Sequence, residues 1–291
     1  MRISAKIMAD HIKANLARQS TQMMETHQKL VSGKRINKPS DDPGGMGKVL
    51  DYRKTLSSIE QYRENILTAK TRLEFSESIL GEVGEFIEQA KDIATNPGGE
   101  NRSPFIQQIR NIREQVLGLA NQRYGQHYLF AGHLSGSPPF GGTSPYAYNG
   151  DAGSHHVMVG EGITIQVEAD GSQMFIDGTD NLFQVLEDLE TALATDPFDL
   201  AAVEATVDPL YRIADRLELT RSELAADYKR MERTDDHWKN FANAVETMRQ
   251  TVEDADIAQA AVDMQVQQTN YEVLLATAGQ IIQPTLVDFL G

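Results

Sequence analysis

Two apolar stripes in heptad spacing, one at each end of the chain, constrain the fold more than any other feature of the sequence. Alternating steps of four and three residues, typical of coiled-coil helices, connect the apolar positions of each stripe. The stripes are Ala5, Ala9, Ile12, Leu16, Gln19, Met23, Thr26 and Leu30, and Ile257, Ala261, Met264, Gln268, Tyr271, Leu275, Ala278 and Ile282. A single helix cannot bury such a stripe, so each helix needs a partner.

The charges of the two ends favour their pairing with each other. Residues 1–38 contain eight Lys or Arg against two acids, whereas residues 253–291 contain six acids and no Lys or Arg. Exposed ion pairs contribute only ~0–1 kcal/mol each, so this attraction sets orientation while apolar burial supplies the stability. The alternative, a basic helix that binds nucleic acid or a membrane surface, is disfavoured by the acidic partner end and by the net charge of −15.

A polar loop, residues 32–43, separates the first stripe from a second heptad run. Within it, Asp42 is suited to cap a helix whose first residue is Pro43. The heptad run predicts a long helix that ends at Asn96-Pro97-Gly98-Gly99. Ser103-Pro104 then predicts a further helix that stops at Tyr124-Gly125 and packs back as an antiparallel hairpin.

Helical periodicity returns after the middle of the chain. We predict that Thr179-Asp180 caps a short helix, that Asp196-Pro197 begins the next one, and that Pro209 breaks or kinks it. The apolar pattern continues to Val252, which predicts a second long helix beside residues 43–95, with Trp238 packed in or beside the seam.

Residues 134–178 have a different pattern, because turn signals surround short alternating runs such as Ile163, Ile165 and Val167. The sequence therefore predicts a mainly α fold with a small β insertion. Its parts are a coiled coil of the N- and C-terminal helices, a long antiparallel helical bundle and a central antiparallel β domain. We assign residues 1–40 and 254–291 to the first, 41–133 and 179–253 to the second, and 134–178 to the third.

An enzymatic function has little support in the sequence. The chain has no cysteine, which removes thiolate nucleophiles and Cys-based zinc sites. His155-His156, near Asp151 and Ser154, is the strongest candidate, but adjacent histidines in a strand point to opposite faces and cannot easily chelate one ion. We expect no catalytic residue, no metal and no cofactor. No run approaches the ~18 apolar residues of a membrane span, and the N-terminus lacks the apolar core of a signal peptide.

Several segments together resemble the flagellin superfamily and, within it, the flagellar hook-associated proteins of type 3, which form the hook–filament junction. The matching segments are Met1-Arg2-Ile3-Ser4, Ser32-Gly33-Lys34-Arg35-Ile36-Asn37, Ser40-Asp41-Asp42-Pro43, Ala120-Asn121, Tyr128-Leu129-Phe130-Ala131-Gly132, Tyr148-Asn149-Gly150-Asp151 and Leu286-Val287-Asp288-Phe289-Leu290. The glycine-rich stretch Gly44-Gly45-Met46-Gly47 departs from the alanine-rich helix start that is usual in the family.

The resemblance implies a flagellin-like fold and a non-enzymatic, structural role outside the cell, in the flagellum at the hook–filament junction. It implies type III export without a cleaved peptide and four kinds of partner: neighbouring copies, the first hook–filament junction protein, flagellin and a dedicated cytosolic export chaperone. Neither nucleic acid nor membrane is an expected partner. The nearest alternatives are flagellin itself, as a filament subunit, and an intracellular coiled-coil scaffold.

Two groups of residues are candidates for this role. The terminal helices are expected to be mobile in the free monomer and to order when neighbours bury their stripes. The assembly interface is predicted at Ile12, Leu16, Met23 and Leu30 against Met264, Tyr271, Leu275 and Ile282. A hinge, or a contact to a neighbouring subunit, is predicted in the loop at Ser32, Gly33, Arg35, Asn37, Asp41, Asp42 and Pro43.

Overall fold

A computed structural model describes residues 2–99, 101–167 and 170–282, with side chains described for residues 7–99, 101–167 and 170–279. The protein is mainly helical, and two short two-stranded sheets lie in its middle. The helices are α1 (Arg2–Ser32), α2 (Pro43–Thr95), α3 (Ser103–Ala120), α4 (Gly171–Phe175), α5 (Leu182–Ala194), α6 (Leu200–Glu204), α7 (Val207–Glu253) and α8 (Ile257–Ile282). The strands are β1 (Arg123–Tyr124), β2 (His127–Tyr128), β3 (His156–Gly160) and β4 (Ile163–Gln166).

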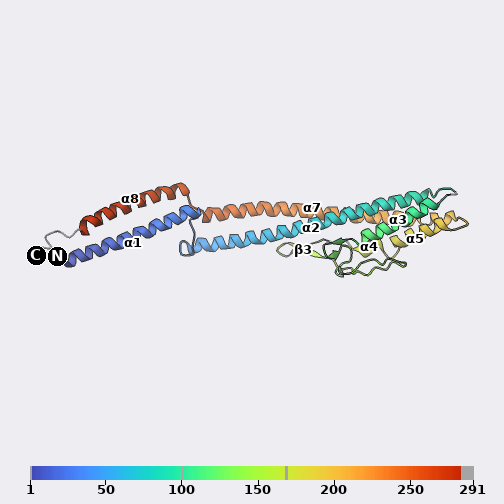
Figure 1. Ribbon diagram of the computed structural model, residues 1–291, viewed down its shortest axis with the longest axis horizontal. Helices are drawn as coiled ribbons and strands as arrows, with labels where there is room; N and C mark the ends of the chain where they lie inside the picture. The colour runs from blue at the N-terminus through green and yellow to red at the C-terminus, as the bar shows by residue number, and fades with distance from the viewer. Residues whose placement is uncertain (1, 100, 168–169, 283–291) are drawn as a thin grey trace. The chain divides into compact units, whose positions relative to one another are not determined.

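Contacts divide the described residues into two compact units. The terminal unit runs up to Ser58 and resumes at Asn240, and the central unit is Ile59–Lys239, so α2 and α7 contribute to both. Figure 1 shows α1 beside α8 and α2 beside α7. The predicted fold class, with paired terminal helices, long antiparallel helices and a small antiparallel β insertion, is confirmed. The three-part division of the chain stays a prediction.

The central unit is built on the pairing of α2 with α7. The guanidinium of Arg63 binds Asp235 at 2.7 Å, and that of Arg221 binds Glu77 at 2.7 Å, so both ion pairs join the two helices. Between them, Ile66 and Leu73 on α2 and Leu224 and Met231 on α7 are at most 6% exposed. Heptad spacing therefore brings these two helices together along an apolar seam with ion pairs at its edges.

Aromatic side chains fill the core beside α3 and α5. Phe130, Phe140, Phe175 and Phe183 are each at most 2% exposed, and their ring centroids lie 5.1–5.9 Å apart in four pairs. Such pairs add ~0.5–1.5 kcal/mol each beyond the burial of their area. The loop-rich middle of the chain is therefore held by a packed aromatic core, because its strands are too short to hold it by themselves.

The β insertion is fastened to the long helices through the edge of β3. Trp238 on α7 donates its indole N–H to the carbonyl of Val159 at 2.6 Å, and Asn65 on α2 donates to the carbonyl of Met158 at 2.8 Å. The Trp238 ring also lies 5.3 Å from that of Tyr62. Trp238 thus packs beside the seam as predicted, and it also anchors the hairpin.

Two of the segments that carry the resemblance, residues 128–132 and 148–151, contact each other. Tyr148 donates its hydroxyl hydrogen bond to the carbonyls of Phe130 and Asp151, both at 3.0 Å, and Asp151 accepts from the His133 amide at 2.6 Å. A Cβ on Gly150 would lie 2.7 Å from the Ala131 carbonyl oxygen, closer than real Cβ atoms approach. The segments around residues 130 and 150 therefore dock backbone to backbone, which requires glycine at the contact.

Three predicted helix boundaries were wrong. The third helix ends at Ala120, and residues 123–128 form the small β1–β2 hairpin instead. Its start at Ser103-Pro104 is as predicted, with Arg102 at the N-cap position and no side-chain cap bond. Asn181 caps α5 because the Asp180 carboxylate is taken by Arg212, at 2.8 Å.

The third wrong boundary is the start of α6. Asp199, rather than Asp196, caps α6, through the amides of residues 201 and 202. Pro209 breaks the helical run as predicted: α6 ends at Glu204, α7 begins at Val207, and Pro209 lies in the first turn of α7, where no N–H is needed for a helical hydrogen bond.

Candidate assembly site

On α1, the predicted apolar stripe faces α8. Every stripe member whose side chain is described is at least half-buried: Ala9, Ile12, Leu16, Gln19, Met23, Thr26 and Leu30. Gln19 donates its side-chain amide to the Gln267 carbonyl at 3.3 Å, which sets α1 against α8 at mid-length. Four of the predicted interface residues, Ile12, Leu16, Met23 and Leu30, therefore lie together on the paired face of α1.

On α8, the face turned toward α1 differs from the predicted stripe. The inward residues are Ala260, Met264, Gln267, Tyr271, Leu274 and Ala278. Of the predicted residues, Met264 and Tyr271 belong to this face, whereas Leu275 is 48% exposed and Leu274 takes its place. The side chain of Ile282 lies outside the described residues. Because apolar residues occupy more than one side of α8, heptad stepping alone could not choose between neighbouring faces.

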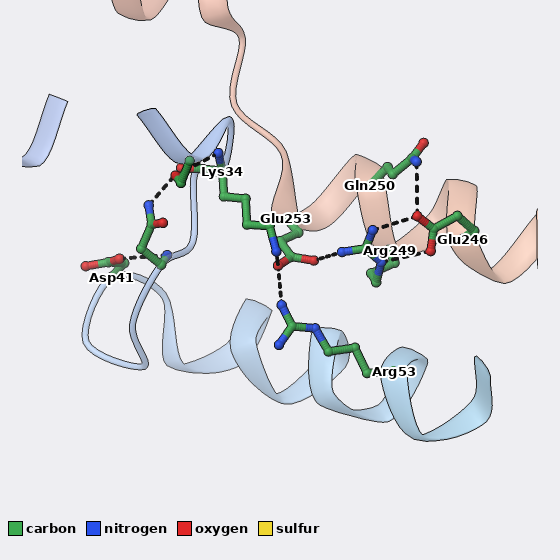
Figure 2. A network of polar contacts seen from close by, with 9 residues as sticks. Lys34, Asp41, Arg53, Glu246, Arg249, Gln250 and Glu253 are labelled. Atoms are coloured by element: carbon green, nitrogen blue, oxygen red, sulfur yellow. Dashed lines mark hydrogen bonds and ion pairs between the residues drawn. The ribbon is translucent and has the colours of Figure 1, made fainter. Parts of the chain in front are cut away.

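A buried carboxylate lies where the terminal helices leave α2 and α7. The side chain of Glu253, the last residue of α7, is 1% exposed. Figure 2 shows three cations around it: Lys34 at 2.6 Å, Arg53 from α2, and Arg249 one turn back on α7. Arg249 also binds Glu246, at 2.6 Å. We call Lys34, Arg53, Arg249 and Glu253 the joint cluster.

Backbone hydrogen bonds fix the same place. The Glu253 carbonyl accepts from the amides of Arg35, at 2.7 Å, and Ile36, at 3.3 Å, while the Ala255 amide donates to the Gly33 carbonyl at 2.9 Å. Gly33 has a φ of 70°, which glycine adopts without strain. The loop after α1 and the link between α7 and α8 are therefore paired like a short piece of sheet.

Side chains of the loop hold its own shape. The Asp41 carboxylate accepts from the amides of Asn37 and Lys38, both at 3.0 Å. Asp42 accepts from the Gly45 amide at 2.8 Å, so it caps α2, whose first residue is Pro43, as the sequence predicted.

The other loop residues of the resemblance have structural contacts too. Ser32 accepts from the Lys34 amide at 3.1 Å, and Asn37 donates to the Lys34 carbonyl at 2.9 Å. Arg35 donates to the Val252 carbonyl at 2.9 Å and to Asp42 at 3.2 Å. A Cβ on Gly45 would lie 2.6 Å from Ile36, so the unusual glycine at this helix start leaves space for the buried Ile36 side chain.

The carboxylates of the joint have pKa values below their ordinary ones. Burial by itself would raise the pKa of Glu253, but hydrogen bonds from Lys34 and Arg53 outweigh it and lower that pKa. The Gly45 amide is the largest cause of the lowered pKa of Asp42. Arg249 has a raised pKa because its hydrogen bonds to Glu246 and Glu253, and their negative charges, stabilise its protonated form. The cluster is therefore a set of fixed, complementary charges at neutral pH.

The histidine pair has different neighbours. His156 is exposed and its ring Nδ1–H donates to the Ser154 carbonyl at 2.9 Å, while the His155 ring lies 5.1 Å from that of His133. Burial lowers the pKa of His155. Among the described residues, no group of three or more His, Cys, Asp or Glu is placed to hold a metal ion. Within the same residues, no helix is both long enough and apolar enough to cross a membrane.

Comparison with known proteins finds similarity to flagellar proteins, in agreement with the sequence motifs. The family described as the bacterial flagellin N-terminal helical region matches residues 3–135. The flagellar hook-associated protein 3 of Salmonella typhimurium is 26% identical over 214 residues, which cover 67% of each chain. That of Escherichia coli is 26% identical over 266 residues, 81% of this chain and 82% of the other. The chain is thus similar in sequence to flagellar hook-associated proteins 3.

A solved structure shares the fold of this chain. The flagellar junction protein of Legionella pneumophila superposes with a TM-score of 0.59 and 13% identity, over 71% of this chain and 99% of the other. The resemblance that the sequence motifs predicted is thus confirmed, and its loop signature is the part that builds the joint.

Sequence reasoning missed the joint cluster, because none of Arg53, Arg249 and Glu253 belongs to a motif. The one available signal was the pair Arg249 and Glu253, four residues apart at the end of a long helix. Nothing in the sequence placed Arg53 or Lys34 against them, since these contacts join distant segments.

Proposed function

We propose that this protein is a non-enzymatic structural subunit of the bacterial flagellum, placed between the hook-associated region and the filament. The observation that carries the proposal is the α1–α8 pair, held by the signature loop at the joint cluster, in a relative of hook-associated protein 3. A pair of half-buried helices with apolar residues left outside is suited to contact further helices.

The partners follow from this role. Neighbouring copies of the chain, the first hook–filament junction protein and flagellin are its proposed contacts in the flagellum, and a cytosolic chaperone is its proposed escort before export. The protein is proposed to act outside the cell. Ser32–Pro43 is proposed as the hinge or neighbour contact, and Ile12, Leu16, Met23, Leu30, Met264, Tyr271, Leu275 and Ile282 as the assembly interface.

Flagellin is the second candidate, because the match over residues 3–135 carries the flagellin name. A gene deletion in the native bacterium separates the two. Loss of a junction protein leaves flagellin in the medium and hooks without filaments, and the reintroduced gene restores attached filaments. Loss of a filament subunit removes flagellin from the medium.

Labelling gives an independent test. Antibodies against the chain are expected to bind one short zone at the base of each filament. Labelling along the whole filament would identify a filament subunit, and absence of the chain from isolated flagella would refute the proposal altogether.

A further inference from the structure

The outer side of α8 carries a second apolar stripe. Val262, Val266 and Val273 are 57%, 54% and 60% exposed. With Thr269 and Ala276 they again follow steps of four and three residues. At about 100° per residue, this stripe is turned by about 160° from the face that meets α1. The pairing within the chain therefore leaves it uncovered. We call Val262, Val266 and Val273 the valine stripe.

The side of α1 near the joint carries an apolar hollow. Its volume is 580 Å³, and it is lined mainly by Met23, Met24, His27, Val31 and Met264. Met24 and Val31 are 69% and 75% exposed. Methionine side chains are flexible and adapt to the shape of an apolar partner. We call this hollow the methionine groove.

The face of the methionine groove continues along α1 in heptad steps. From Val31 the steps of four and three residues pass His27 and Met24 and reach Ser20, Ala17 and Lys13. Small residues at the middle of this face permit close approach of another helix. The groove therefore lies at one end of a second face of α1 on which another helix could pack. The valine stripe is the corresponding second face of α8.

The charges beside the two faces are opposite. In the described part of α8 the valine stripe is flanked by Asp263 and Glu272, and residues 257–282 contain no Lys or Arg. The face of the groove begins at Lys13, in a segment where residues 1–38 hold eight Lys or Arg against two acids. Opposite charges with matched spacing favour contact between the two faces over contact of either face with itself.

We propose that the valine stripe of one copy packs into the methionine groove and along the adjoining face of α1 in a neighbouring copy. The contact is heterologous: each copy offers its α8 to one neighbour and its α1 to another. Such contacts close into rings or continue as helical arrays. This inference rests on the proposed function and names the surfaces by which copies of the chain meet.

Cysteine cross-linking tests the contact, because the chain has no cysteine of its own. Cells carry two gene copies, an untagged Met24→Cys variant and a tagged Val266→Cys variant, and their isolated flagella are treated with a short bis-maleimide. We expect a product joining tagged and untagged chains. Two variants in separate copies cannot link within one chain. The control replaces Val266→Cys by Gln268→Cys, which is also exposed but points away from the stripe.

The outcomes are separable. A product from the Val266 pair that the Gln268 control lacks supports the inference, and Val262→Cys repeats the test if Val266→Cys is not incorporated. Both variants present in isolated flagella without such a product, or with an equal product from the control, would overturn the inference while the proposed function stands. Absence of the wild-type chain from flagella would overturn the proposed function itself.

Discussion

Replacement of Glu253 by Gln probes the joint cluster with little change in shape. One carboxylate oxygen of Glu253 accepts from Lys34 and Arg53, and the other accepts from Arg249. A glutamine keeps one acceptor and presents an NH₂ group in place of the other. Whichever way the amide turns, a donor then faces a donor, and three cations lose their shared counter-charge.

The structure sets the size of the effect. Loss of one partner from a fully buried ion pair costs about 3–5 kcal/mol. Here Lys34 and Arg53 are 36% and 47% exposed, and Arg249 keeps Glu246, so water and a second acid compensate part of the loss. We expect Glu253→Gln to destabilise the joint by about 1.5–3 kcal/mol.

Amide hydrogen exchange at Ala255 measures this locally, because that amide donates to the Gly33 carbonyl across the joint. The expected change is an exchange rate roughly 10- to 100-fold faster, at 1.4 kcal/mol per factor of ten. Asp254→Asn is the matched control, since it removes the same charge from the exposed neighbouring residue. Equal exchange at Ala255 in the two variants would refute the reasoning that Glu253 holds the joint.

Three further outcomes are expected. Leu274→Ala should lower the free energy of unfolding by about 1–2 kcal/mol, and Leu275→Ala by under about 0.5 kcal/mol, because only Leu274 lies in the seam. Urea unfolding followed by circular dichroism measures both values, and the reverse order would contradict the assigned α8 face. Because the pKa of Glu253 is lowered from its ordinary 4.5, its stabilisation is present above that pH and lost as the pH falls through the lowered pKa; the protection factor of the Ala255 amide, its intrinsic exchange rate divided by the observed rate, should therefore fall in acid less in Glu253→Gln than in wild type. Trp238→Phe removes the hydrogen bond to Val159 and should cost the β3–β4 hairpin about 0.5–1.5 kcal/mol, visible as faster amide exchange there; unchanged exchange would show that packing alone anchors it.

Local signals predicted the long helices well. Asp42 and Pro43 mark the start of α2, and the prolines and glycines after Thr95 mark its end, because capping and helix breaking depend on neighbouring residues only. The stripe of α1 was equally readable, since its inward face carries the longest apolar run in heptad spacing on that helix. In these segments the local pattern and the tertiary contacts agree.

Prediction failed where two neighbouring residues were equally suited to a role and a contact with a distant residue selected one of them. Asp180 and Asn181 are both suited to cap a helix, and Arg212, far along the chain, takes the first and leaves the second. Leu274 and Leu275 are equally apolar, and only contact with α1 selects Leu274. The joint cluster has the same origin, because its charges come from α2, α7 and the loop between α1 and α2.

The pairing of Gly33 with Ala255 has a consequence for how the chain can change in length. This hydrogen bond joins the loop after α1 to the link before α8. From there α1 and α8 run side by side to the contact of Gln19 with Gln267. One residue inserted into the short link before α8 would turn that helix by about 100° and exchange its seam for another face. Lengthening is therefore expected to be tolerated in the turn after α2 and rejected at the joint, where a single added residue resets every contact that follows.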